Sequence, residues 1–292
     1  MKRLYWLSPI IVTLFFCSCS HRPGKNEIKV MTLNIRYDNP DDSTNAWPKR
    51  ASMVCRFLKF ERPDVLGLQE VLLNQYDVLQ TYLKDYSSVG VGRSDGAKDG
   101  EMNPVFFRKD RYDLVRTKTF WLSEDPESAG SKSWGSSLPR IVTWIELADK
   151  KSHNHFYFFN THFAHDSDSA RTMSARLLLF RIDSIAAGFP FILTGDFNMT
   201  PSGNGYKILT GPAESVPLLS DSYIVSEKRP GGPTFTFNGF SDKSGNERID
   251  YIFVKHGMKV LEHYTLSEKE RKVFISDHWP VEAIISTKLP RK

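Results

Sequence analysis

The chain has 292 residues, of which 40% are hydrophobic and 25% are charged. This composition can build a packed core, and it excludes a disordered or collagen-like chain. Lysine and arginine outnumber aspartate and glutamate by 39 to 34, which gives a formal charge of +5. Such a mild surplus permits an anionic substrate but does not indicate a polybasic nucleic-acid-binding surface.

The first residues have the pattern of an export signal. Two basic residues precede a short, mostly apolar run from Leu4 to Phe16. A membrane-spanning helix needs about 20 apolar residues, so a secretory signal is the better interpretation. Ser18 before Cys19 resembles a bacterial lipoprotein processing site, with Cys17 as a second candidate and ordinary signal cleavage as the alternative. We expect residues 1–19 to direct export to the cell envelope or periplasm, and Cys19 to carry a lipid that tethers the protein to a membrane.

The remainder is expected to form a polar tether over residues 20–27 and a continuous domain over 28–292, because no long Pro/Gly/Ser linker or repeat interrupts it. Once the signal is removed, Cys55 is the only cysteine besides Cys19, so no intrachain disulfide is expected within the domain. Cys55 stands in an apolar helical pattern and is expected to be buried rather than nucleophilic. We expect a monomer.

The hydrophobic pattern predicts more strands than helices. Helical periodicity is found at residues 47–60, 73–84 and 169–187. Strand patterns are found at residues 28–35, 64–69, 103–108, 140–147, 155–163, 190–198, 248–254 and 279–287. Strands often follow one another directly, which favours an α/β sandwich of mixed sheets over a regular βαβ repeat. The polar stretch 123–138 is predicted to be a long loop.

Polar residues collect at the ends of these strands. They are Asn34, Glu70, Asn160, His162, Asp196, Asn198, Asp250, Asp277 and His278. Asp196 and Asn198 are two apart and would face the same side of an extended chain, while Phe197 faces away. Taken singly, each has a simpler explanation, such as a turn for Asp196, a helix cap neighbour for Glu70 or a buried core histidine for His162. Because unpaired buried carboxylates are costly, we expect the whole set to share one rim.

Six segments in a fixed order resemble the endonuclease/exonuclease/phosphatase superfamily. They are LNIRYD (33–38), LGLQEV (66–71), NTHF (160–163), TGDFN (194–198), RIDYIF (248–253) and SDHWPV (276–281). The resemblance covers essentially all of residues 28–287. It implies a four-layer α/β sandwich, with two packed mixed β-sheets flanked by helices. It also implies a divalent metal, Mg²⁺ or Mn²⁺, and metal-dependent hydrolysis of phosphate esters.

The same resemblance implies a metal site. Glu70 would be the central ligand, with Asn34 and Asp277 beside or near the ion. Oxygen ligands of this kind suit Mg²⁺ or Mn²⁺.

It also implies the catalytic roles. Asp196 would orient or deprotonate the attacking water, and Asn198 would donate its amide to a phosphate oxygen. His278 would contact the scissile phosphate, and His162 would hold the phosphate from another side. Asp250 would hydrogen-bond one of the histidines and favour its charged form.

Substrate choice depends on the segments 89–107, 120–144 and 161–175, which look closest to bacterial secreted or surface members. Candidate pocket residues within them are Arg93, Glu101, Trp134, Arg140, His165 and Arg171. For each arginine a surface ion pair is the simpler alternative, while Trp134 could stack on a base or sugar ring. Because every Lys/Arg cluster is mixed with acids, a small phosphoester and a nucleic acid both remain open as substrates.

Two other functions fit part of the pattern. A non-catalytic surface binding lipoprotein would use the anchor and the aromatic residues, but it gives no reason for the six segments. A glycosidase with two carboxylates would leave the histidines and both candidate asparagines, Asn34 and Asn198, without a role.

Overall fold

The computed structural model describes residues 24, 26–211, 219–243, 245, 247–255 and 257–287. The predicted export signal and Cys19 lie outside the described residues. Within them, no helix combines the length and the apolar character needed to cross a membrane.

The described residues form two six-stranded sheets. The first has the order β11 (Val260–Thr265), β14 (Val281–Ser286), β1 (Glu27–Asn34), β2 (Val65–Gln69), β4 (Val105–Arg108) and β3 (Tyr86–Val89). The second has the order β5 (Tyr112–Trp121), β6 (Ile141–Asp149), β7 (His155–His162), β8 (Phe191–Asp196), β10 (Asp250–Lys255) and β9 (Leu219–Asp221). A separate ribbon joins β12 (Lys269–Glu270) to β13 (Val273–Phe274).

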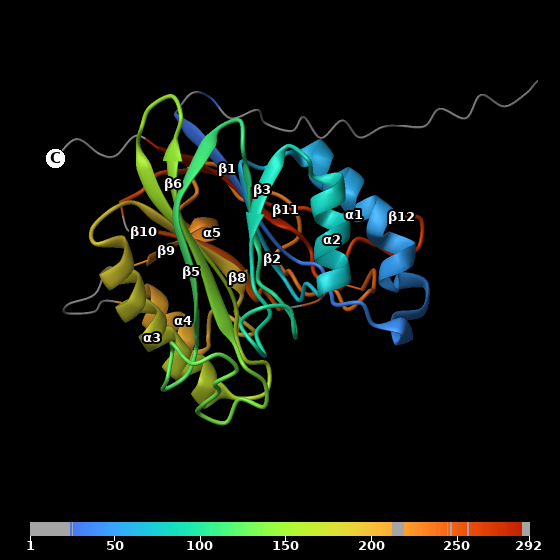
Figure 1. Cartoon of the computed structure of the whole chain (residues 1–292). Coiled ribbons are helices and arrows are strands. Elements are labelled where there is room, and N and C mark those ends of the chain that lie inside the picture. Colours follow the sequence, from blue (N-terminus) through green and yellow to red (C-terminus); the bar gives the residue numbers. More distant parts are fainter. Residues whose placement is uncertain are drawn as a thin grey trace, which may run out of the picture.

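Helices cover the outer face of each sheet (Figure 1). α1 (Trp47–Glu61) and α2 (Leu73–Tyr82) pack on the first sheet, and α3 (Asp168–Ala186) and α4 (Asn204–Thr210) pack on the second. Two shorter helices are η1 (Pro40–Asn45) and α5 (Ser222–Val225). Both sheets are mixed, because β1 runs parallel to β2 and β7 runs parallel to β8 while their other pairs are antiparallel. The expected four-layer α/β sandwich is confirmed.

The two-residue period of a strand determines where the polar residues go. In β7, Tyr157 and Phe159 pack with the helices, whereas Phe156 and Phe158 pack between the sheets. Continuing along the inward face, the next side chain is that of Asn160. The layer between the sheets is therefore apolar along most of its length and becomes polar at the carboxyl end of the strand.

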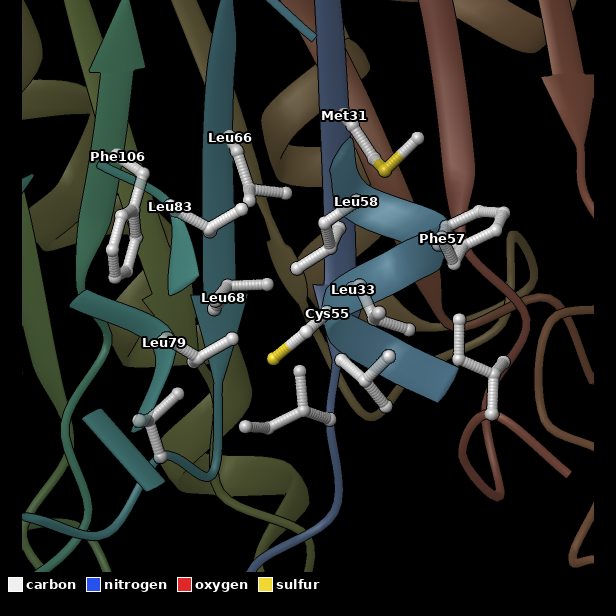
Figure 2. Packing of buried hydrophobic residues seen from close by; sticks show 14 of the residues in the cluster. Met31, Leu33, Cys55, Phe57, Leu58, Leu66, Leu68, Leu79, Leu83 and Phe106 are labelled. Carbon is white, nitrogen blue, oxygen red and sulfur yellow. The ribbon is translucent and has the colours of Figure 1, made fainter. Parts of the chain in front are cut away.

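Cys55 lies in the core between the first sheet and its helices. Its side chain packs among Leu33, Leu58, Leu68 and Leu79 (Figure 2). It is a buried free cysteine, and burial raises the pKa of its thiol to about 11. The prediction of a buried cysteine is confirmed, and a raised thiol pKa disfavours the nucleophilic thiolate near neutral pH.

Several boundaries differ from the sequence prediction. The strand expected to run through Asn198 ends at Asp196, and Asn198 has a left-handed φ of 49°. The helix expected to reach residue 84 ends at Tyr82. β5 was not predicted, because it is an edge strand whose middle residues are exposed and its inward–outward alternation is lost. Residues 123–138 contain no helix or strand, as expected.

Candidate active site

A buried polar layer under the site joins the two sheets. Gln69 of β2 donates from Nε2 to Thr32 Oγ1 at 3.0 Å and to Asn160 Oδ1 at 2.6 Å. Asn160 of β7 donates from Nδ2 back to the carbonyl of Leu68 at 2.7 Å. Gly67 makes room for this layer, since a Cβ there would lie 2.5 Å from Asn160 Oδ1. Asn160 therefore supports the site from below, although its sequence pattern is the same as that of a site residue.

Asn34 joins two carboxylates above this layer. Its Nδ2 donates to Glu70 Oε1 at 2.9 Å and to Asp196 Oδ2 at 3.0 Å. Its own Oδ1 accepts from the backbone N–H of Arg36 at 2.9 Å. Glu70 also accepts from the backbone N–H of Tyr37 at 3.1 Å. Asn34 thus presents its amide nitrogen to the acidic cluster, whereas the resemblance had placed it among the metal ligands.

His278 and Asp250 form a buried ion pair. His278 Nδ1 lies 2.8 Å from Asp250 Oδ2, and its Nε2 lies 3.8 Å from Asp196 Oδ2. Burial alone would lower the pKa of His278, but Asp250, Asp196 and Asp277 outweigh it and raise the pKa well above its ordinary value. These carboxylates therefore favour the protonated form of His278, in which Nδ1–H donates to Asp250 and Nε2–H faces the pocket beside Asp196. Asp250 contacts a histidine, as expected.

The pKa of His162 is shifted in the opposite direction. Its pKa lies well below the ordinary value, chiefly because of burial and then because of Arg140 and Arg93. Its Nε2 lies 3.0 Å from Asn198 Nδ2, which makes Nε2 the acceptor and places the proton on Nδ1. Asn198 Nδ2 also donates to the carbonyl of Phe163 at 3.0 Å. Both amide hydrogens of Asn198 are therefore used within the protein, and its expected donation to a phosphate oxygen stays a prediction.

The loop before β14 brings Asp277 to the same place. Ser276 Oγ donates to the carbonyl of Asn34 at 2.6 Å, which ties this loop to the end of β1. Arg50 of α1 strengthens the tie, because its buried guanidinium donates to the carbonyls of Ile35 and of Ile275, the latter at 2.9 Å. Sequence reasoning missed Arg50, because its partners are backbone carbonyls.

A pocket of about 480 Å³ opens over these groups. Among the predicted residues its lining includes Glu70, Glu101, Arg140, His162, His165, Asp196, Asn198, Asp277 and His278. Asn34 and Asp250 contact this set from beneath. Arg93 lies behind Glu101, with which it makes two hydrogen bonds of 2.8 Å.

Two predicted pocket residues lie elsewhere. Trp134 is not part of the pocket lining, and its carbonyl accepts from Ser167 Oγ at 2.8 Å. Arg171 is also outside the lining, and its guanidinium donates to the carbonyls of Ala164 and His165. Arg171 therefore supports the segment that carries His165. Its partners are backbone carbonyls, so the sequence could not predict this contact.

Six lining residues were not predicted. They are Arg36, Tyr37, Leu138, Phe237, Glu247 and Ile249. Arg36 and Tyr37 follow β1 directly, so the segment LNIRYD contained the signal that could have found them. Phe237 packs edge-on against the His278 ring with centroids 5.1 Å apart, and the two residues form an isolated antiparallel β-bridge. The alternation of threonine and phenylalanine over residues 234–237 is the sequence signal that could have found it.

The side chains around Glu70 suit a hard divalent cation. One ligand atom each from Glu70, His162 and Asp196 lies within 4.8 Å of the other two. Burial, and then the charge of Asp250, raise the pKa of Asp196 to about 7. Burial raises the pKa of Asp277 as well, and Glu70 adds to that rise. A bound cation would relieve this crowding of carboxylates, and carboxylate oxygens are preferred by Mg²⁺ and Mn²⁺.

Comparison with known proteins identifies the family. Residues 31–278 match the model of the Endonuclease/Exonuclease/phosphatase family. The chain belongs to this family. An endonuclease/exonuclease/phosphatase structure from Bacteroides vulgatus is 37% identical, with a TM-score of 0.86, and the match covers 91% of this chain and all of that one.

Relatives in the family carry different names. A mannosyl-6-phosphatase of Bacteroides thetaiotaomicron is 32% identical, with a TM-score of 0.81, over 88% of this chain and 98% of that one. A probable RNA exonuclease of Saccharomyces cerevisiae is 29% identical over 234 residues, which are 70% of this chain and 45% of that protein. The endonuclease/exonuclease/phosphatase fold therefore carries hydrolysis of phosphate esters, with substrates that differ among members.

Proposed function

We propose that the protein hydrolyses phosphate esters with the help of a divalent metal ion. One observation carries the proposal: a continuous series of contacts runs from Asp250 through His278 to Asp196, and from Asp196 through Asn34 to Glu70. These residues come from separate strands and loops, yet they meet at one pocket. Family membership supports the same reaction class.

Glu70 would hold the ion, with Asn34 and Asp277 beside it. When bound, Mg²⁺ or Mn²⁺ would supply Lewis-acid stabilisation of the negative charge that develops on the phosphoryl oxygens. Asn34 keeps the Glu70 and Asp196 carboxylates in a fixed relation through its two hydrogen bonds.

Asp196 acts on water. Its carboxylate is held by Asn34 at Oδ2 and by the backbone N–H of Asn198 at Oδ1. It takes a proton from a water molecule whose oxygen attacks phosphorus, while the bond from phosphorus to the ester oxygen breaks. The departing alkoxide takes a proton from solvent, so the products are an alcohol and phosphate. A positioned base of this kind contributes about 10²–10⁴-fold.

The two histidines bind the phosphoryl group in different charge states. The His278 imidazolium, oriented by Asp250, donates to a phosphoryl oxygen and offsets charge in the transition state. Neutral His162, fixed by Asn198, lines the opposite side of the pocket.

The test measures hydrolysis of 4-nitrophenyl phosphate with Mg²⁺ and with EDTA. Chelation should abolish turnover, and His278→Ala and Asp196→Asn should each lower kcat by about 10²–10⁴-fold with the fold intact. Asp113→Asn, at an exposed position of β5, is the matched control and should keep the full rate. Turnover that persists in EDTA would contradict the metal mechanism. Tight phosphoester binding without turnover, unaffected by Glu70→Gln, would identify a non-catalytic surface binding lipoprotein instead.

We further propose an exported protein that acts on a small phosphoester. Similarity to a mannosyl-6-phosphatase supports this substrate class, whereas similarity to a probable RNA exonuclease keeps nucleic acid as the alternative. Binding to a nucleic-acid backbone weakens steeply with salt, so activity that is flat between low and high salt favours the small substrate. Residues 1–19 support export, with Cys19 as the lipid-bearing residue.

A further inference from the structure

A loop from the first sheet closes one side of the pocket. Residues 90–104 connect β3 to β4 and reach across to the second sheet, where Trp121 Nε1 of β5 donates to the carbonyl of Arg93 at 2.7 Å. Within the loop, the Arg93 guanidinium makes a bidentate pair with the Glu101 carboxylate, both bonds being 2.8 Å. Glu101 lines the pocket. The substrate therefore meets a charged wall on this side.

Arg140 belongs to the same wall and has N–H groups that are not used in hydrogen bonds among the described residues. It directly precedes β6, it lines the pocket, and its side chain is only 4% exposed. Its Nη2 lies 2.9 Å from His165 Nδ1. Its Nε and Nη1 have no hydrogen-bond acceptor in the described part of the chain. A buried guanidinium with unpaired N–H groups is unfavourable, so an acceptor from outside the protein is expected.

The charges of the wall favour an anion as that acceptor. Glu101 is already paired with Arg93, and among the residues that the structure describes no carboxylate is in direct contact with Arg140. Burial lowers the pKa of Arg140, and the neighbouring Arg93 lowers it further, although Glu101 and Asp196 act in the opposite direction. A neutral hydroxyl would accept the N–H groups but would leave this charge unbalanced, whereas an oxyanion satisfies both.

We propose that Arg140 binds a terminal, non-ester oxygen of the reacting phosphate, so that the protein is a phosphomonoesterase. The inference rests on the proposed phosphoester hydrolysis and adds its substrate class. A phosphomonoester has three non-ester oxygens, so it can place one on Arg140 while the other two face His278 and the expected metal site at Glu70. A diester has only two non-ester oxygens and a single negative charge, so one of these three positions would be left without an anionic oxygen. The alcohol of the monoester then extends past Leu138 and Phe237, the half-exposed apolar residues of the lining.

The experiment compares two substrates that differ by one methyl group, 4-nitrophenyl phosphate and methyl 4-nitrophenyl phosphate. The natural protein should have the higher kcat/KM on the monoester. Arg140→Met should lower kcat/KM on the monoester by about 10–100-fold, the range expected for loss of a charge-assisted hydrogen bond, and should change the diester by less than about 5-fold. Arg140→Lys, which keeps the charge but not the planar fork, should fall between the two.

Binding of inorganic phosphate gives a readout independent of turnover. Its inhibition constant should rise by about the same factor in Arg140→Met and should not change in Arg176→Met, an exposed arginine of α3. A natural protein that prefers the diester would overturn the inference, as would an Arg140→Met variant that loses both activities equally or neither. Absence of metal-dependent turnover on both substrates would instead reject the proposed function.

Discussion

Replacing Arg50 should lower both the free energy of unfolding and the affinity of the expected metal site for Mg²⁺. Arg50 is fully buried in α1, and its guanidinium donates to four backbone carbonyls. Two of the acceptors, Ile35 and Arg36, follow Asn34, and a third, Ile275, lies two residues before Asp277. One side chain therefore fixes both segments that carry these expected metal ligands.

The size of the effect follows from those bonds. Hydrogen bonds from a charged donor contribute about 1.5–3 kcal/mol each, and a buried carbonyl left without a donor costs about 1–3 kcal/mol. Arg36 keeps a second donor, since Gln75 Nε2 also contacts its carbonyl at 2.9 Å. Arg50→Met would lose all four hydrogen bonds. The resulting loss in the free energy of unfolding would approach the total stability of a domain, which is about 5–15 kcal/mol. Arg50→Lys keeps the charge and some of the donors, so we expect a loss of about 1–3 kcal/mol in the free energy of unfolding.

The assay combines urea unfolding with metal titration of activity. Groups that orient metal ligands typically change metal affinity by about 10–100-fold when replaced, so Arg50→Lys should raise the Mg²⁺ concentration for half-maximal activity by about 10-fold or more. Arg56→Lys, on the same helix with its side chain 59% exposed, is the control and should change neither quantity. The reasoning fails if Arg50→Lys is destabilised as expected and yet needs no more Mg²⁺ than the natural protein.

Two further predictions concern the histidine pair and the anchor. Asp250→Asn removes the carboxylate that, against the effect of burial, helps to keep the pKa of His278 raised. The proposed reaction uses protonated His278, and the variant should lower the pKa of this histidine. Activity should therefore begin to fall at a lower pH than in the natural protein, and an unchanged alkaline limb in a pH–rate profile would refute the role. Cys19→Ala should move the protein expressed with residues 1–19 from the membrane fraction to the soluble fraction, and a protein that is soluble with Cys19 intact would exclude the lipid anchor.

Alternation along the strands made much of the site predictable from the sequence. In β8, Ile192 packs between the sheets, and Asp196, four residues further on, lies on the same face at the end of the strand. The same two-residue period in β7 carries the inward face from Phe158 to His162. The apolar residues determine which face of each strand points between the sheets. The polar residue at the end of such a series lies on the same face and therefore reaches the edge of the sheets where the pocket lies.

The alternation along strands could not predict side-chain contacts to backbone groups or the points where the backbone changes direction. Asn160 and His162 have equal sequence signals, but only the depth of each along the strand shows that Asn160 belongs to the supporting layer. Asn198 leaves the extended conformation, because Asp196 Oδ1 accepts its backbone N–H at 2.9 Å and its φ becomes positive. Its side chain therefore reaches His162 by a turn, whereas the spacing predicted a shared strand face.

The site contains residues held by the strands and residues held by a loop, and this difference explains how members of one fold family can accept different esters. Asp196 and Asp250 pair across neighbouring strands and are buried, so their placement depends on the sheet itself. The wall beyond His162 has another origin, since Arg93 and Glu101 come from the connection between β3 and β4. The Trp121 Nε1–H bond to the Arg93 carbonyl ties this connection to β5, and backbone bonds between Met102 and Val71 tie it to the first sheet. Cleavage inside a polymer needs a passage that continues on both sides of the reacting phosphate, and this connection places Glu101 in the pocket lining on one side. Changes confined to that loop should therefore alter which ester enters without moving the strand residues that we propose act on it.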